Sequence, residues 1–254
     1  MTYQVDLNSD LGESFGAYTI GQDELVLEQI TSANIACGYH AGDHNVMRRT
    51  INLAVEKQVG LGAHPGLPDL IGFGRRQMNV DPDDVYNFII YQIGALQGFA
   101  ELHRLMLNHV KPHGALFNMA TKDPAIAQAI AEAVYQLNPH LILFGLANGE
   151  LVKAGEKVGL TVANEVFADR TYQPDGSLTP RTSPNAMIHD ADEATRRVIR
   201  MVKEGKVAAV DGSDVDLTAD TICVHGDEPS ALQFVKQLRH ALTENGITLK
   251  RVGS

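Results

Sequence analysis

Two histidines, His40 and His44, stand four residues apart in the segment NIACGYHAGDH, where an apolar run ends in polar residues and glycines. This spacing can place two imidazoles on one face of a helix. With Asp10, which follows an earlier apolar run, they form a candidate ligand set for zinc or another divalent ion that activates water. The segment lacks the glutamate that zinc-protease helices carry between the two histidines. A tight turn with Asp43 as the N-cap of a helix explains the same residues without a metal.

Two further segments carry histidines close to apolar runs. In GAHPGLPDLIGFGRRQM, His64 precedes a proline, and the guanidinium of Arg75 matches the oxygens of a carboxylate or a phosphate. In HVKPHGALFN, Lys111 and His113 occupy alternate positions and therefore share one face of an extended segment. A lysine that points into a protein interior needs an anion, so Lys111 is predicted to have a functional role.

The segments NEVFADRTY and CVHGDEP complete the set of candidates. Glu165 lies inside an apolar strand, where an ion pair with Lys111 or Arg170 is the simplest structural explanation. In the second segment His225 ends a strand, and Asp227 could cap the last helix.

These residues divide into two predicted roles. The candidates for proton transfer or charge stabilisation in catalysis are Asp10, His40, His64, Lys111, His113 and His225. The candidates for contacts with substrate or phosphate are Glu13, Asn34, Asp43, Arg75, Glu165, Asp169, Arg170 and Asp227. Residue type and spacing do not rank the candidate bases.

The elements that must position these residues alternate along the chain. Short apolar runs predict strands over Gln4–Asn8, Ala33–Cys37, Gly60–Ala63, His109–Lys111, Leu141–Leu146, Thr161–Val166 and Ile222–Val224. Amphipathic patterns predict helices over Asp23–Ile30, Asn45–Lys57, Pro82–Met106, Pro124–Leu137, Glu150–Val158, Ala191–Glu204 and Glu228–Glu244. A small hairpin is predicted within 206–217, and a long loop over 171–184.

This alternation predicts parallel strands joined by right-handed crossovers. Ionisable residues follow most of the predicted strands, and ligands bind at the carboxyl ends of strands in such folds. We therefore expect an α/β fold in which residues 1–254 form a single domain. The expected architecture is a distorted TIM-like (β/α) barrel with about seven parallel strands. An open doubly wound sheet is the alternative.

Composition excludes several classes of function. The chain has 31 acidic and 21 basic residues, a formal net charge of −10 and no basic cluster, so neither nucleic acid nor an anionic membrane is an expected partner. Two cysteines exclude a disulfide framework. No signal peptide and no membrane-spanning stretch are visible, which predicts a cytoplasmic protein. The phosphate-loop and dinucleotide-binding glycine motifs are also missing.

Several motifs together resemble the LamB/YcsF family. They are VDLNSDLGESFG, SANIACGYHAGD, GAHPGLPD followed by GFGRR, VKPHGALFN, EVFADRTYQPDGSLTPR and CVHGD, and they occur in order over nearly the whole chain. The resemblance implies a barrel related to the polysaccharide-deacetylase-like barrel. This chain departs from the family pattern at His44, where the family usually has a small residue or proline. A metal site built on His44 would therefore not be a shared feature of the family.

The resemblance also implies a reaction and partners. Family members cleave the lactam of 5-oxo-L-proline to L-glutamate with hydrolysis of ATP, and they work with two further subunits, B and C. It implies 5-oxoproline and ATP as ligands and leaves a divalent metal and a homo-oligomer open. Two alternatives remain. One is a metal-dependent deacetylase of N-acetylated carbohydrates that uses Asp10, His40 and His44. The other is a non-catalytic subunit that binds substrate for its partners.

Overall fold

Seven strands close into a parallel barrel in this computed structural model, which describes residues 3–224 and 231–254. In their spatial order the barrel strands are β1 (Tyr3–Leu11), β2 (Ser32–Ala36), β3 (Gly60–His64), β4 (His109–Val110), β5 (Ile142–Leu146), β6 (Thr161–Phe167) and β9 (Thr221–Val224). The ring closes because β9 pairs with both β6 and β1. The predicted distorted barrel is confirmed, and the alternative of an open sheet is wrong.

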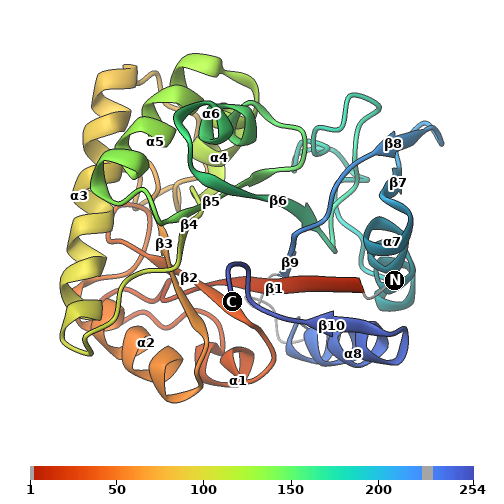
Figure 1. Ribbon diagram of the computed structural model, residues 1–254, viewed down its shortest axis with the longest axis horizontal. Coiled ribbons are helices and arrows are strands. Elements are labelled where there is room, and N and C mark those ends of the chain that lie inside the picture. The colour runs from red at the N-terminus through yellow and green to blue at the C-terminus, as the bar shows by residue number, and fades with distance from the viewer. Residues whose placement is uncertain (1–2, 225–230) are drawn as a thin grey trace.

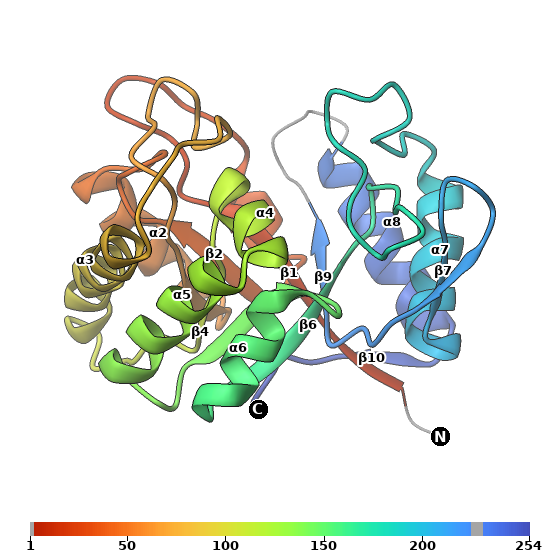
Figure 2. The same ribbon diagram turned by 90° about the horizontal axis from the view of Figure 1, so that it is seen from above.

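Helices cover the outside of this barrel (Figure 1). They are α1 (Asp23–Leu27), α2 (His44–Glu56), α3 (Pro82–Glu101), α4 (Gly114–Lys122), α5 (Pro124–Leu137), α6 (Glu150–Val158), α7 (Ala191–Glu204) and α8 (Ala231–Glu244). None of the described helices is both long and apolar enough to cross a membrane. Figure 2 shows the loops after β1 and β3 and the long loop after β6 on the same side of the molecule.

The remaining strands lie outside the ring. β10 (Ile247–Leu249) pairs in parallel with the start of β1 and was missed by the sequence analysis. The strands β7 (Lys206–Ala208) and β8 (Asp214–Asp216) form an antiparallel pair, which confirms the predicted hairpin.

Two predicted helices end several residues earlier than expected, and one helix was not predicted. The helix predicted over Asp23–Ile30 ends at Leu27. The helix predicted over Pro82–Met106 ends at Glu101, and soon afterwards Arg104 adopts a positive φ of 58°, which an α-helix does not allow. The sequence analysis missed α4, which is only 9 residues long and therefore offers few positions at helical spacing. The start of the helix predicted over Glu228–Glu244 lies outside the described residues.

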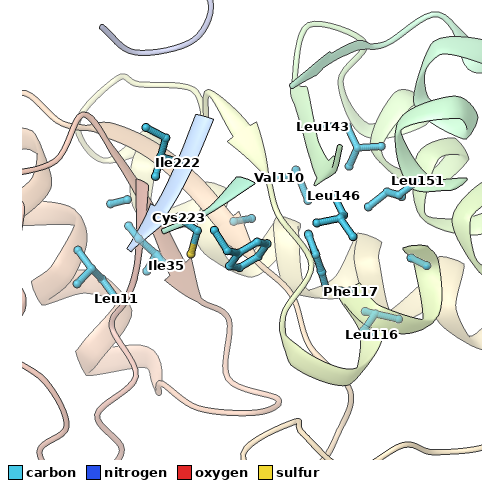
Figure 3. Close-up of a cluster of buried hydrophobic side chains, with 14 of the residues drawn as sticks. Leu11, Ile35, Val110, Leu116, Phe117, Leu143, Leu146, Leu151, Ile222 and Cys223 are labelled. Carbon is cyan, nitrogen blue, oxygen red and sulfur yellow. The ribbon is translucent and has the colours of Figure 1, made fainter. Parts of the chain in front are cut away.

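Apolar side chains fill the space between the strands and the helices. Figure 3 shows part of this core, including Leu143 and Leu146 from β5, Leu151 from α6 and Phe117 from α4. These side chains are buried, and their burial attaches the two helices to the barrel.

The inside of the barrel is polar, unlike the apolar layers that usually fill a (β/α) barrel. Residues at alternate positions of β1 share one face of the strand, and the side chains of Asp6, Asn8 and Asp10 bond to other barrel strands. Asn8 donates to Glu165 of β6, and Asn34 of β2 donates to Asn8 and Asp10. A hydrogen-bonded network of polar side chains thus runs along the inside of the barrel to Asp10, near the carboxyl end of β1.

His109 is a fully buried member of this interior. Its ring stacks on Phe144 with centroids 4.2 Å apart, and its Nε2 lies 2.8 Å from Oδ1 of Asn34. A Cβ on residue 62 would come within 2.0 Å of this nitrogen, so Gly62 is what leaves room for the ring. Burial lowers the pKa of His109 to about 3.

We expect His109 to make stability depend on pH. Its folded pKa is below the unfolded value of about 6.5, so its contribution is present above pH 6.5 and is lost as pH falls toward 3. Between these two pKa values, one such group adds up to about 1.4 kcal/mol per pH unit to the slope of the free energy of unfolding against pH. Urea unfolding of His109→Gln at several pH values should show a slope that is smaller by about this amount. An unchanged slope would contradict the assignment.

Asp43 is the N-cap of α2, as predicted, and we expect Asp43→Ala to lower the free energy of unfolding by about 1 kcal/mol. Its carboxylate accepts hydrogen bonds from the backbone N–H groups of Asn45, Val46 and Gly16 at 2.7–2.9 Å. Urea unfolding measures the loss. Asp43→Asn is the matched control, because an asparagine oxygen can still cap the helix. Equal losses in both variants would exclude capping as the cause.

Candidate functional site

A cavity of about 970 Å³ opens at the carboxyl ends of the barrel strands. Seven of the predicted site residues line it: Asp10, Glu13, His64, Arg75, Lys111, His113 and Arg170. They come from the ends of four strands and from the segments that follow them, which is where ligands bind in (β/α) barrels. The closed barrel therefore brings together residues that are far apart in the sequence.

Lys111 is the central cation of the site, and only 2% of its surface is exposed. Its Nζ lies 2.8 Å from Oε1 of Glu165 and 3.0 Å from Oδ1 of Asp10. It also donates to Asn8 and to the sulfur of Cys223. Burial opposes the charge of Lys111, but the neighbouring carboxylates outweigh it and raise the pKa well above its usual value. The predicted ion pair with Glu165 is confirmed.

Three histidines meet beside Lys111. The rings of His40 and His113 are stacked, with centroids 3.7 Å apart and planes 3° from parallel. The ring of His64 stands at 90° to that of His113. Burial lowers the pKa of both His40 and His113 well below the usual range, and the neighbouring histidines lower it further. These two side chains are therefore neutral at neutral pH.

Backbone carbonyls orient two of these rings. Nδ1 of His64 lies 2.7 Å from the carbonyl oxygen of Lys111, and Nε2 of His113 lies 2.8 Å from that of Phe73. Nε2 of His64 lies 2.9 Å from Nδ1 of His113 and 3.3 Å from Oδ2 of Asp10. The histidines and Asp10 thus form one continuous polar group at the cavity wall.

Glu13 joins the histidines in a buried group that could hold a metal ion. Glu13, His40, His64 and His113 each offer one ligand atom, and these atoms lie within 4.8 Å of one another. His44, a member of the predicted triad, is exposed at the first residue of α2 and does not belong to this group. The predicted set is corrected here, because the turn at 41–43 leads the chain to the surface before His44.

Other predicted site residues do not reach the cavity wall. Asn34 and Glu165 are held inside the barrel by Asn8 and Lys111, and His40 is fully buried. Asp43 uses its carboxylate on the backbone at the start of α2. Asp169 is partly buried and is not among the lining residues. These five residues therefore do not line the cavity. His225 and Asp227 lie outside the described residues.

Residues that the sequence analysis did not single out also line the cavity. They include Asn118, Lys122, Ser177, Thr179, Arg181 and Thr182. Two of them lie on α4, which was not predicted, and the others lie in the predicted loop over 171–184. Position in that loop was the available signal, because a polar loop over the strand ends can contact a ligand.

Arg170 holds this loop in place. Only 5% of its surface is exposed, and it donates to the carbonyl oxygens of Thr179 and Ala186. Burial lowers its pKa to about 10, so it stays positively charged at neutral pH. Arg75 is exposed, with its guanidinium 5.0 Å from the centre of the Phe73 ring. The two arginines therefore differ in solvent exposure, although both line the cavity.

Comparison with known proteins identifies close relatives. Residues 5–254 match the model of the LamB/YcsF family. A protein of Oceanobacillus iheyensis that is named as the A subunit of 5-oxoprolinase is 68% identical over 251 residues, which cover 99% of this chain and 98% of the relative.

Solved structures agree in fold. A lactam utilization protein from Thermus thermophilus has a TM-score of 0.92 and 44% identity, covering 97% of this chain and 99% of that one. A polysaccharide deacetylase from Bacillus cereus has a TM-score of 0.50 and 10% identity, covering 99% and 93%. The second likeness bears on the fold alone, and it agrees with the predicted relation to the deacetylase barrel.

Proposed function

The chain belongs to the LamB/YcsF family, and we propose that it is the A subunit of an ATP-dependent 5-oxoprolinase that opens the lactam of 5-oxo-L-proline to L-glutamate. The observation that carries this proposal is the 68% identity to the A subunit of a 5-oxoprolinase over nearly the full length of both chains. ATP and two partner subunits, B and C, are part of the proposal.

The reaction explains why the cavity would need both cations and bases. A lactam is a resonance-stabilised amide, so water attacks it slowly. Phosphorylation of its oxygen would make the ring carbon electrophilic and would couple ring opening to ATP hydrolysis. The developing negative charge then needs cations, and the attacking water needs a base.

The cationic residues of the cavity suit the acidic ligands of this reaction. Arg75, Lys122 and Arg181 are exposed members of the cavity wall, and Arg170 is a buried one. We propose that they bind the substrate carboxylate and phosphate oxygens. Lys111 already pairs with two carboxylates, so its role is to fix Asp10 and Glu165 rather than to bind phosphate directly.

The proposed base is Asp10, and His64 is the residue that holds it. Both line the cavity, and Oδ2 of Asp10 lies 3.3 Å from Nε2 of His64. His113 continues the group on the other side of His64. A carboxylate that is held by a neighbouring side chain keeps a fixed orientation toward the water from which it takes a proton.

The test measures glutamate release from 5-oxo-L-proline. The chain alone, subunits B and C together, and all three are each assayed with and without ATP. We expect ATP-dependent release only from the mixture of all three. Inactivity of that mixture would contradict the proposal. Full activity of subunits B and C without this chain would also contradict it.

A second assay separates catalysis from mere substrate binding. The mixture is prepared with Asp10→Asn, and 5-oxoproline binding is measured together with turnover. We expect turnover to fall by about 10²-fold or more while the substrate still binds. Full turnover by this variant would instead favour a non-catalytic role for the chain.

A further inference from the structure

The hydrogen bonds of His64 and His113 to backbone carbonyls leave one nitrogen of each ring without a hydrogen, and these two nitrogens face each other. A carbonyl oxygen only accepts, so Nδ1 of His64 and Nε2 of His113 must each carry a hydrogen for Lys111 and Phe73. The other nitrogens of the two rings then face each other at 2.9 Å. In two neutral imidazoles both of these atoms are lone-pair acceptors, and two acceptors at this distance repel.

A positive species between the two nitrogens removes this repulsion. Carboxylates flank the same position, since Oδ2 of Asp10 lies 3.3 Å from Nε2 of His64 and Oε1 of Glu13 lies 3.6 Å from Nδ1 of His113. Glu13 is buried beside the histidines, and its Oε1 also lies 3.3 Å from Nε2 of His40. The position therefore offers two nitrogen and two oxygen ligands to a cation.

We propose that this position binds one divalent transition-metal ion of the zinc class, with Nε2 of His64, Nδ1 of His113 and the carboxylate of Glu13 as ligands and Asp10 beside them. Metal–ligand bonds of about 2.0–2.2 Å put neighbouring ligand atoms about 2.9 Å apart at right angles and about 3.4 Å apart in a tetrahedron. The separations of 2.9, 3.3 and 3.6 Å fall close to these values.

The chemistry of the ligand set agrees with this choice. Imidazole nitrogens favour zinc and its neighbours, whereas magnesium and calcium prefer sites made of oxygen alone. Histidines that bind metals usually donate their other N–H to a carbonyl or carboxylate, which fixes the ring. Both His64 and His113 do so here.

His40 is excluded from the proposed ligands by its orientation. The lone pair of an imidazole nitrogen lies in the plane of the ring, and the planes of His40 and His113 are 3° from parallel at a centroid distance of 3.7 Å. Two rings stacked in this way cannot both direct a lone pair at one ion. His40 instead supports the site, because its Nε2 contacts Oε1 of Glu13 at 3.3 Å and its ring packs on His113.

The test is metal binding by the full chain, which does not depend on the proposed reaction. The chain is stripped with a chelator and titrated with Zn²⁺ or Co²⁺, and binding is followed by equilibrium dialysis and by the visible absorption of Co²⁺. We expect one ion per chain. His64→Gln and His113→Gln should each weaken binding by at least about 10-fold. Circular dichroism checks that they fold, and Glu13→Gln provides a third, milder variant.

His44→Gln is the control for the ligand assignment, because it removes the exposed histidine of the triad predicted from the sequence. It should bind one ion with nearly unchanged affinity. His40→Phe keeps a ring stacked on His113 but loses the contact with Glu13, so it should weaken binding less than His64→Gln or His113→Gln does. The proposal is overturned if the wild-type chain shows no saturable binding. It is also overturned if the folded His64→Gln and His113→Gln variants bind like the wild type, or if His40→Phe abolishes binding.

Discussion

Replacing Lys111 by methionine should lower the free energy of unfolding by about 3–5 kcal/mol, because it leaves buried carboxylates without their cation. Glu165 is completely buried, and Lys111 and Asn8 are the partners of its Oε1 among the described residues. Chemical unfolding followed by circular dichroism measures the loss.

The double variant Lys111→Met with Glu165→Met tests this explanation. It removes both members of the buried pair, and replacing a whole buried pair by apolar residues is often neutral for stability. We therefore expect it to recover a large part of the loss, while turnover of the complex stays low. A double variant as unstable as the single one would show that the unpaired carboxylate is not the cause.

An exposed ion pair provides the matched control. Lys57 and Glu28 lie 3.0 Å apart, but their side chains are 28% and 45% exposed. Lys57→Met should therefore lower the free energy of unfolding far less than Lys111→Met does. The comparison separates the effect of burial from the effect of removing a lysine.

Replacing His64 by glutamine should reduce the turnover of the assembled complex by about 10²–10⁴-fold. His64 connects Asp10 to His113, and its other nitrogen is held by the backbone of Lys111. Its loss removes the contact that holds the proposed base Asp10 and separates Asp10 from His113. The measurement is steady-state glutamate formation, with kcat and KM determined separately.

His240→Gln is the control for this substitution, because His240 is exposed on α8 and pairs with Glu244. It should leave kcat unchanged within about twofold, since surface changes of this kind have small effects. Pull-down with subunits B and C checks that His64→Gln still assembles. If His64→Gln assembles and retains turnover near the wild-type rate, His64 has no part in the chemistry.

Much of the architecture could be predicted from the sequence because its signals are local. Apolar runs marked the seven barrel strands, and amphipathic periodicity marked most of the helices. The hydrogen bond from Asn45 to Asp43 spans only two residues, so the cap of α2 could also be read from its residue types. α4 was missed because a helix of 9 residues gives only a weak local pattern.

The sequence by itself determined which residues stand at the strand ends, and hence that Asp10, His64, Lys111 and His113 could share one site. Only the tertiary structure decided how they meet. The barrel must close before Lys111 can reach Glu165, and the loop after β3 must fold back before Phe73 can orient His113. The spacing of His40 and His44 describes one turn of chain, whereas the contact of His64 with His113 spans 49 residues. Contacts of that range depend on strand register and ring orientation, which no local pattern encodes.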